Sequence, residues 1–558
     1  MHKQFNKVLK TIVGGLLATS LIACSPALPP NSSGVLYCSE GNPESFNPQM
    51  VTSATTLDMT SLQLYDTLIE YNEQQQEFRP ALATEWKVTS DGRVYTFSLR
   101  ENVQFHQTPY FSPTRSFTAD DVIFSFQRWL DPEHPYHFVS GGHYPFFRAT
   151  KLDQLIQRIS APTPYTVRIE LREPDSSFMS TLSSSFAVIL SAEYGQQLLL
   201  AHEPHRIDQQ PIGTGPFKFR DFRQDVSVNY LRHDTYWRGP AASESLVFRI
   251  TPSDHKRMLM LLTGDCDISP YPPARDIAWL KQRDDVNVQQ SLSPNTAFWA
   301  FNTERPPFNQ PLVRQALAHA INREALIRSV YYDHAVIAES ILPDTSWAHV
   351  ALPEAYSYDP VKARNLLTAA GFPNGFSMDI WALPVQRSYN PSARMMAEKM
   401  QADLAFVGIR ANIVSYEWRS FRRRLAQGEH DSVLIGWSAD HSDPDNFFRP
   451  LLTCAAKRSV NNRALWCHEG FDQLVTAAIR TTEISERQRL YRAAQQLLAE
   501  EVPVLPLAHS IRYQVSRKNV QGILPPTFGG IRLHPVYIDR SEPGPVTSTV
   551  TENTGGVP

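Results

Sequence analysis

The sequence predicts an α/β fold in which mixed sheets are flanked by helices. Before about residue 295, several short segments alternate apolar with polar residues, as half-buried strands do. An Asp-Gly turn joins two of these segments. After residue 295, short apolar runs alternate with apolar stripes at helical spacing. Together these patterns favour mixed α/β lobes over one uniform sheet.

The first predicted element is a hairpin. Residues 86–88 and 95–99 each alternate apolar and polar side chains, and Asp91 and Gly92 lie between them. An Asp-Gly pair between two alternating runs is a strong hairpin signal.

A helix is predicted after this hairpin, over residues 119–129. Thr118 is suited to be its N-cap, acidic residues occupy its first turn, and its apolar residues share one face. Further strands are predicted at 167–171 and 226–230, because apolar residues alternate there again.

Beyond residue 295, strands and helices follow one another. Residues 298–302 and 433–435 are short apolar strands. Four apolar stripes predict helices, of which the last three end at Gly or Pro, as helices commonly do. They cover residues 312–321, 359–371, 396–408 and 490–503.

The composition is that of an ordinary globular protein. The chain has 558 residues, of which 42% are hydrophobic and 20% charged, with a formal net charge of -3. This length suits roughly three to four domains. The charge provides no basic field to attract nucleic acid, so a nucleic-acid partner is not expected. Residues 541–558, mainly Pro, Gly, Thr and Ser, are predicted to be disordered.

The first 23 residues are predicted to be a bacterial export signal, because lysines precede a short apolar run that ends in small residues. Cys24 follows directly, and Leu-Ile-Ala-Cys resembles a lipobox, in which the signal is cut before an acylated cysteine. We therefore expect residues 24–34 to be a tether that a lipid on Cys24 holds to a membrane. The alternative is a soluble secretory signal in which Cys24 is incidental.

The remaining four cysteines predict two disulfides. Cys38, Cys266, Cys454 and Cys467 are an even number in an oxidising compartment, and they allow three pairings. The short spacing favours Cys454 with Cys467, which leaves Cys38 for Cys266. In the chain-entropy model the long loop contributes about 4–5 kcal/mol and the short one about 3 kcal/mol. Neither pair has Cys-x-x-Cys spacing, so zinc and redox chemistry are disfavoured.

Catalytic motifs are missing from the sequence. It contains no Gly-x-Ser-x-Gly elbow, no His-Glu-x-x-His and no Walker loop. Residues 213–216 begin like a dinucleotide fingerprint but lack its third glycine, so a rigid turn is favoured. We therefore expect a protein that is not an enzyme and that has no metal and no cofactor.

Four spaced segments, at residues 80–106, 117–122, 211–217 and 301–316, follow one another in the order of a known family. They resemble the large peptide-binding proteins of ABC importers, the dipeptide- and oligopeptide-binding family (family 5). The resemblance covers about residues 35–535. A further segment, residues 436–454, resembles most the Sap-type protein, which is linked to antimicrobial-peptide resistance, and the dipeptide binder.

This resemblance implies the two-lobed periplasmic-binding-protein fold of type II, cluster C, with an additional third domain. Lobe I would comprise residues 35–65, 213–290 and 510–540, domain II residues 66–212, and lobe III residues 291–509. The lobes would close over a ligand. The resemblance also implies the two disulfide pairings that spacing favours.

A general peptide binder must hold what all peptides share, namely the backbone, the ammonium and the carboxylate. The resemblance implies that Asp440 takes the ammonium and Arg387 the carboxylate, which suits an arginine fork. The alternatives are that Arg387 is a surface residue and Asp440 a turn residue of a polar loop, as we expect Asp443 and Asp445 to be.

Aromatic residues near these two charges are expected to form walls of the pocket. Trp437, Tyr389 and Trp418 are the candidates, although they could equally belong to the core. Ser438 and Thr52 complete the predicted peptide-binding set.

The expected function is that of the substrate-binding component of an ABC peptide transporter, which delivers peptides to permease subunits in the inner membrane. The Sap-type resemblance extends this to cationic antimicrobial peptides. We expect a monomer in the periplasm, anchored to a membrane by lipid. Haem is an alternative cargo, whose propionates could contact the arginine cluster of residues 419–424. A secreted hydrolase with paired carboxylates and a chaperone-like surface protein are further alternatives.

Overall fold

The computed structural model describes residues 34–540, apart from 73–74, 292–293, 459–460, 525–527 and 529. The predicted export signal, Cys24 with its tether up to residue 33, and the tail 541–558 lie outside the described residues. In the part of the chain that is described, no helix is long and apolar enough to cross a membrane.

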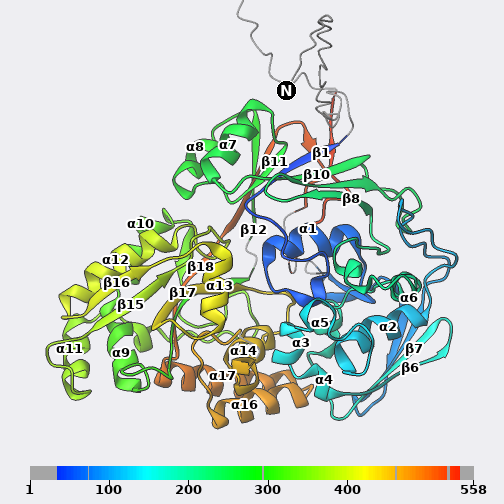
Figure 1. Cartoon of the computed structure of the whole chain (residues 1–558). Coiled ribbons are helices and arrows are strands. Elements are labelled where there is room, and N and C mark those ends of the chain that lie inside the picture. The colour runs from blue at the N-terminus through cyan, green and yellow to red at the C-terminus, as the bar shows by residue number, and fades with distance from the viewer. Residues whose placement is uncertain are drawn as a thin grey trace, which may run out of the picture.

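Three larger sheets divide the described chain into three parts (Figure 1). The first is a seven-stranded mixed sheet, in which β1 pairs in parallel with β10 and β11 and the other neighbours are antiparallel. In spatial order its strands are β12 (Val286–Ser291), β19 (Arg512–Arg517), β11 (Ile268–Pro270), β1 (Val35–Ser39), β10 (Ser245–Ile250), β9 (Ser227–Arg232) and β8 (Phe217–Arg223). We call this sheet and its helices the seven-stranded part; the helices are α1 (Ala54–Leu64), α7 (Asp254–Thr263) and α8 (Ile277–Leu280).

The second sheet has six strands and is also mixed, because β15 pairs in parallel with β16 and β17 while β13 is antiparallel to β17 and β18. Its order is β14 (Ala335–Ile337), β18 (Val504–Ser510), β13 (Asn295–Phe301), β17 (Ser432–Ser438), β15 (Ser377–Ala382) and β16 (Arg410–Val414). Its helices are α9 (Pro311–Ala320), α10 (Arg323–Val330), α11 (Pro360–Ala369), α12 (Ala393–Phe406), α13 (Trp418–Ala426), α14 (Asp445–Leu452), α15 (Cys454–Arg458), α16 (Glu469–Arg480) and α17 (Ile484–Glu501). We call this the six-stranded part.

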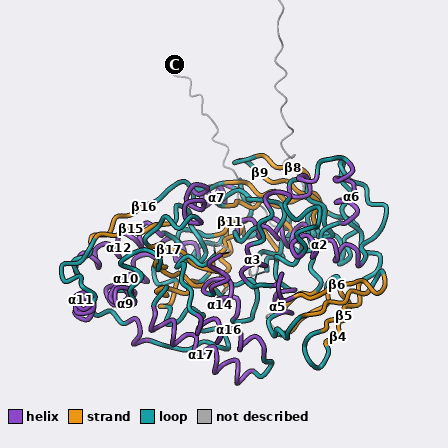
Figure 2. The backbone as a smooth tube through the Cα atoms, turned by 60° about the horizontal axis from the view of Figure 1, so that its bottom comes forward, coloured by secondary structure: helices purple, strands orange, loops and turns teal. Residues whose placement is uncertain are grey.

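The third sheet is antiparallel and has four strands. Their order is β4 (Ala83–Val88), β5 (Val94–Leu99), β7 (Thr166–Leu171) and β6 (Ile156–Thr163). With α2 (Ala119–Leu130), α3 (Pro145–Ala149), α4 (Leu152–Leu155), α5 (Phe178–Leu182) and α6 (Ala192–Leu200) it makes the four-stranded part. Two small ribbons, β2 (Ile69–Asn72) with β3 (Glu77–Pro80) and β20 (Val520–Gln521) with β21 (Tyr537–Ile538), complete the strands. Figure 2 shows β4–β6 and β15–β16 at opposite ends of the molecule.

Each of the three parts has its own hydrophobic core. The largest core surrounds the six-stranded sheet and includes apolar residues of α14, α16 and α17. Two others lie against the four-stranded and the seven-stranded sheets, and a smaller cluster joins α7 and α8 to β12 and β19. Burial of these apolar faces is the main force that stabilises each part.

Local patterns predicted most of these elements correctly. The Asp-Gly hairpin is β4–β5, and Gly92 has the positive φ of 68° that its turn requires. At the start of α2, the Asp121 carboxylate accepts a hydrogen bond from the Thr118 N–H at 2.9 Å. The prediction for β9 is one residue early, because Val226 precedes the strand and is 49% exposed.

Both predicted disulfides are present in the structure. Cys38 of β1 is bonded to Cys266, which precedes the neighbouring strand β11, and Cys454 is bonded to Cys467. The second bond closes a loop with a sequence separation of 13 residues directly after α14. That loop contributes to the site described next.

Candidate ligand-binding site

A cavity lies between the seven-stranded and the six-stranded parts. Its walls come from the start of α1 (residues 52–58), the loop after β15 (387–389), α13, and the end of β17 with the loop that follows (435–440). In Figure 1, α1 and α13 face each other near the centre of the molecule. All six predicted binding residues line this one cavity: Asp440, Arg387, Trp437, Tyr389, Ser438 and Thr52.

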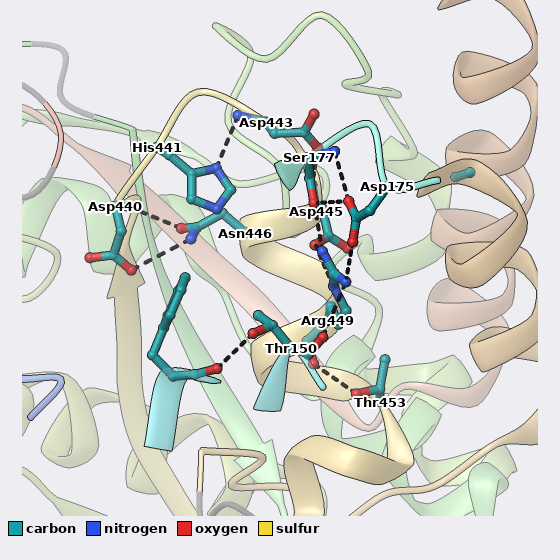
Figure 3. Close-up of polar contacts among 12 residues, drawn as sticks. Thr150, Asp175, Ser177, Asp440, His441, Asp443, Asp445, Asn446, Arg449 and Thr453 are labelled. Carbon is teal, nitrogen blue, oxygen red and sulfur yellow. Dashed lines mark hydrogen bonds and ion pairs between the residues drawn. The ribbon is translucent and has the colours of Figure 1, made fainter. Parts of the chain in front are cut away.

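Asp440 is a buried carboxylate without a cationic partner among the described residues. It lies two residues after β17 and is 8% exposed. Its polar contacts are with Asn446, whose Oδ1 accepts from the Asp440 N–H at 3.0 Å and whose Nδ2 donates to Asp440 Oδ2 at 3.5 Å (Figure 3). Burial raises the pKa of Asp440 to about 7, and the hydrogen bond from Asn446 opposes this only in part.

The histidine next to Asp440 does not neutralise it. Burial lowers the pKa of His441 to about 4, so this ring is neutral at neutral pH. The Asp440 carboxylate is therefore ready to accept a cation from a ligand.

Asn446 is a site residue that the sequence did not indicate. Its Oδ1 accepts from Trp437 Nε1 at 2.9 Å as well as from the Asp440 backbone, so one side chain fixes both. Its place in the first turn of α14, six residues after Asp440, was the available signal.

The expectation that Asp443 and Asp445 are turn residues of a polar loop is right only in part. Asp443 Oδ1 accepts from the Asp445 N–H at 3.0 Å, as a turn residue does, but both side chains are buried in ion pairs. The Asp443 carboxylate accepts two hydrogen bonds from Arg487, at 2.8 and 2.9 Å. Asp445 pairs with Arg449 at 2.6 Å. Both aspartates are buried. Because each has an arginine partner, their charges are compensated within the protein, unlike that of Asp440.

Arg449 also joins two parts of the molecule. Its guanidinium donates to Asp175 at 2.8 Å, to Ser177 at 2.5 Å and to the carbonyl of Thr150 at 3.1 Å, all in the four-stranded part (Figure 3). This network holds the start of α14, and with it Asn446, against the four-stranded part.

Arg387 faces the seven-stranded part across the cavity. Its side chain is 11% exposed, so it is not a surface residue. The guanidinium lies 4.6 Å from the ring centroid of Trp418, and its Nη1 is 3.9 Å from Glu40 Oε1. At that distance the ion pair with Glu40 leaves hydrogen-bonding capacity for a ligand.

The three aromatic residues both line the cavity and pack at the edge of the core. The two alternatives for them, pocket wall and core, are therefore each partly right. Tyr389, Trp418 and Trp437 line the cavity and pack against the large core of the six-stranded part. The ring of Tyr389 lies against Gly436, where a Cβ would be 2.4 Å from the ring. Ser438 ties β17 to the loop of Arg387 by a 2.9 Å hydrogen bond with Ser388.

Two further charged pairs border the cavity. Arg512 donates to Asp58 at 2.9 Å, and burial still raises the pKa of Asp58 to about 6. Arg422 of α13 forms an ion pair with Glu44 across the two parts. Within the described residues, no group of three or more His, Cys, Asp or Glu side chains could hold a metal ion.

Two α/β parts that face each other over a cavity with opposite charges define a two-lobed binding protein. The chain belongs to the bacterial extracellular solute-binding proteins, family 5, whose family model matches residues 77–459. That family consists of binding proteins rather than enzymes. The fold is the α/β periplasmic-binding-protein fold of cluster C, with mixed sheets flanked by helices.

The chain is similar to proteins that are named for different ligands. It is 40% identical to the dipeptide-binding protein of Escherichia coli over 94% of this chain and 98% of the relative. It is also 40% identical to heme-binding protein A of Haemophilus influenzae, over 90% and 92%. The crystal structure of a dipeptide-binding protein from Pseudoalteromonas sp. SM9913 with Met-Leu superposes with a TM-score of 0.89 at 46% identity, over 90% of this chain and all of that one.

The sequence predicts a particular similarity to the Sap-type protein, but the identity to that protein is no higher than the identity to the dipeptide-binding protein. The SapA protein of Escherichia coli is 37% identical over 95% of this chain and 97% of its own, slightly below the dipeptide-binding protein.

Proposed function

We propose that this protein is the substrate-binding component of an ABC transporter for peptides. It captures a peptide in the cavity and delivers it to permease subunits in the inner membrane. Membership of the solute-binding family supports this, as does the likeness to dipeptide-binding proteins, one of them in complex with Met-Leu.

The observation that carries the proposal is the uncompensated carboxylate of Asp440. A buried charge without a partner is costly, and a peptide ammonium would supply the missing positive charge. Arg387 would receive the peptide carboxylate, for which its guanidinium fork is suited. Tyr389 and Trp437 would form the walls, and Ser438 and Thr52 would border the peptide backbone.

Capture would proceed by closure of lobe I (35–65, 213–290, 510–540) on lobe III (291–509), with domain II (66–212) beside them. The strands of the three large sheets fall in these ranges, except that β12 and β18 each extend one residue past a boundary, to 291 and 510, and this agreement supports the division. A ligand that contacts both lobes stabilises the closed state, because only that state provides both sets of contacts.

We place the protein in the periplasm as a monomer, held to a membrane by a lipid on Cys24. The lipobox-like sequence supports the anchor, and the periplasmic description of relatives such as SapA supports the compartment. Metabolic labelling tests the anchor: the fatty-acid label is expected on the unaltered protein and not on Cys24→Ala. Unlabelled protein that starts at another residue would refute it.

Transport of cationic antimicrobial peptides is a narrower form of the proposal. Its support is the 37% identity to SapA, a protein described as a peptide transport protein in Salmonella typhimurium. The charges of the cavity add none, because several arginines line it.

Haem is a second candidate cargo, favoured by the likeness to heme-binding protein A. Of the arginine cluster 419–424, Arg422 lines the cavity, and it is already paired with Glu44. Haem would therefore rely on other cations for its propionates.

Calorimetry on protein freed of bound ligand tests the two candidates. Ala-Ala is expected to bind, and N-acetyl-Ala-Ala and Ala-Ala amide to bind much more weakly, because each block removes one of the two charges. Haem binding without any binding of Ala-Ala would replace the proposal with the second candidate.

A further inference from the structure

The loop closed by the Cys454–Cys467 disulfide brings two hydrogen-bond donors to the cavity. Asn461 and Arg463 both line it. The loop is held at its centre by Asn462, whose Nδ2 donates to the carbonyls of Thr453 at 3.3 Å and Trp466 at 2.7 Å. These side chains are therefore placed on a fixed support.

The backbone of Arg463 is fixed as well. Its carbonyl accepts from His430 Nε2 at 2.7 Å. Burial lowers the pKa of His430 to about 4, which keeps that ring neutral. The carbonyl of Ala464 accepts from the Thr303 N–H at 2.9 Å, which attaches the same loop to the end of β13.

Neither donor has an acceptor in the described part of the chain. The Nδ2 of Asn461 is buried and makes no hydrogen bond. The guanidinium of Arg463 is partly buried and has no carboxylate within 4.0 Å among the described residues. Burial and then the charge of Arg422 lower the pKa of Arg463 to about 9, so it is still positive at neutral pH.

The other arginines around the cavity each face a carboxylate. Arg422 pairs with Glu44, Arg512 with Asp58, and Arg387 faces Glu40. Glu40 also attracts Arg257, a buried arginine that donates to Gln386 beside Arg387. Asp254 attracts Arg257 as well. Arg463 is therefore the one arginine of the cavity lining that faces no carboxylate among the described residues.

We propose that Arg463 and Asn461 form a subsite for a second carboxylate of the ligand. This rests on the proposed function, in which Arg387 receives the terminal carboxylate. The subsite would take the side chain of a C-terminal Asp or Glu, so that acidic peptides are the preferred class. A carboxylate can accept from the guanidinium fork of Arg463 and from the amide of Asn461 at once.

The test is calorimetry with Ala-Glu and Ala-Gln, which differ by one charge at nearly equal size. The unaltered protein is expected to bind Ala-Glu roughly ten- to a hundredfold tighter, as a charge-assisted hydrogen bond implies. Arg463→Gln should reduce that ratio to below about threefold while its affinity for Ala-Gln is unchanged. The matched control is Arg423→Gln, because Arg423 is an exposed arginine of α13 outside the cavity. It should keep the full ratio.

The outcomes separate the subsite from the proposed function. Equal affinity of the unaltered protein for both peptides would overturn the subsite, while Ala-Gln binding would still support peptide capture. Equal weakening of Ala-Glu and Ala-Gln by Arg463→Gln would assign Arg463 to the terminal carboxylate instead. If no peptide binds, both ideas fail.

A second source of two carboxylates is haem, so haem and its dimethyl ester form a further arm. The proposal that the subsite takes an acidic side chain is supported if the preference for Ala-Glu depends on Arg463 and if haem and its dimethyl ester bind with the same affinity. Binding of haem alone, lost in the ester and in Arg463→Gln, overturns the peptide subsite and assigns the same residue to a propionate. Melting temperatures within a few degrees of the unaltered protein show that each variant is folded.

Discussion

Replacement of Asp440 by Asn should abolish most of the affinity for peptides with a free ammonium. The rise of the Asp440 pKa from 3.8 to about 7 corresponds to ~4 kcal/mol by which burial disfavours the ionised carboxylate. A bound ammonium offsets this, and without the carboxylate the ammonium itself is buried unpaired. Loss of one partner of a desolvated pair costs about 2–5 kcal/mol, or roughly thirty- to several-thousand-fold in affinity.

The assay is calorimetry at pH 8 on folded protein freed of ligand, with Ala-Ala and N-acetyl-Ala-Ala. Asp440→Asn should weaken Ala-Ala strongly and N-acetyl-Ala-Ala little. Asp445→Asn is unsuitable as a control, because it breaks the buried pair with Arg449. Asp284→Asn is suitable, because Asp284 is exposed and does not line the cavity. Equal affinity of Asp440→Asn and the unaltered protein for Ala-Ala would remove Asp440 from the site.

The same contacts also determine the pH dependence of binding, the stability of the fold and the closure of the lobes. Affinity for Ala-Ala should fall by up to about tenfold per pH unit below pH 7, because Asp440 is then protonated in the free protein and must release a proton on binding. Calorimetry in two buffers that shows no proton release would contradict this prediction. The stability of the unliganded protein should change the opposite way, since a raised carboxyl pKa favours the fold as pH falls from 7 towards 4. Arg449→Met should destabilise the protein by about 3–5 kcal/mol in denaturant unfolding, because it leaves the buried carboxylates of Asp175 and Asp445 unpaired; a change below about 1 kcal/mol would show that the network is dispensable. Small-angle scattering should show a smaller radius of gyration with saturating Ala-Ala than without it. Glu44→Gln should enlarge the ligand-free radius, because it removes an ion pair across the cavity. Identical profiles with and without Ala-Ala would exclude closure.

The sequence predicts the strands and helices that follow from a local period of apolar residues, and the site residues that lie in spaced motifs. Alternation and an Asp-Gly turn predict β4–β5, and the Gly-Trp pair near the end of β17 leads to Asp440. The rest depends on contacts between distant segments. Arg449 and Asp175 are 274 residues apart, and no periodicity relates them. Asn461 and Arg463 reach the cavity because a disulfide closes their loop, so their role depends on tertiary placement that the spacing of two cysteines does not specify.

The central claim is that the cavity holds a ligand by a free ammonium and a free carboxylate. Mass spectrometry of the small molecules released when the purified protein is denatured tests this most directly. We expect short peptides with both termini free, enriched in C-terminal Asp or Glu, and their loss from Asp440→Asn protein purified in the same way. Release of haem, or of peptides with blocked amino termini, from the unaltered protein would contradict the account.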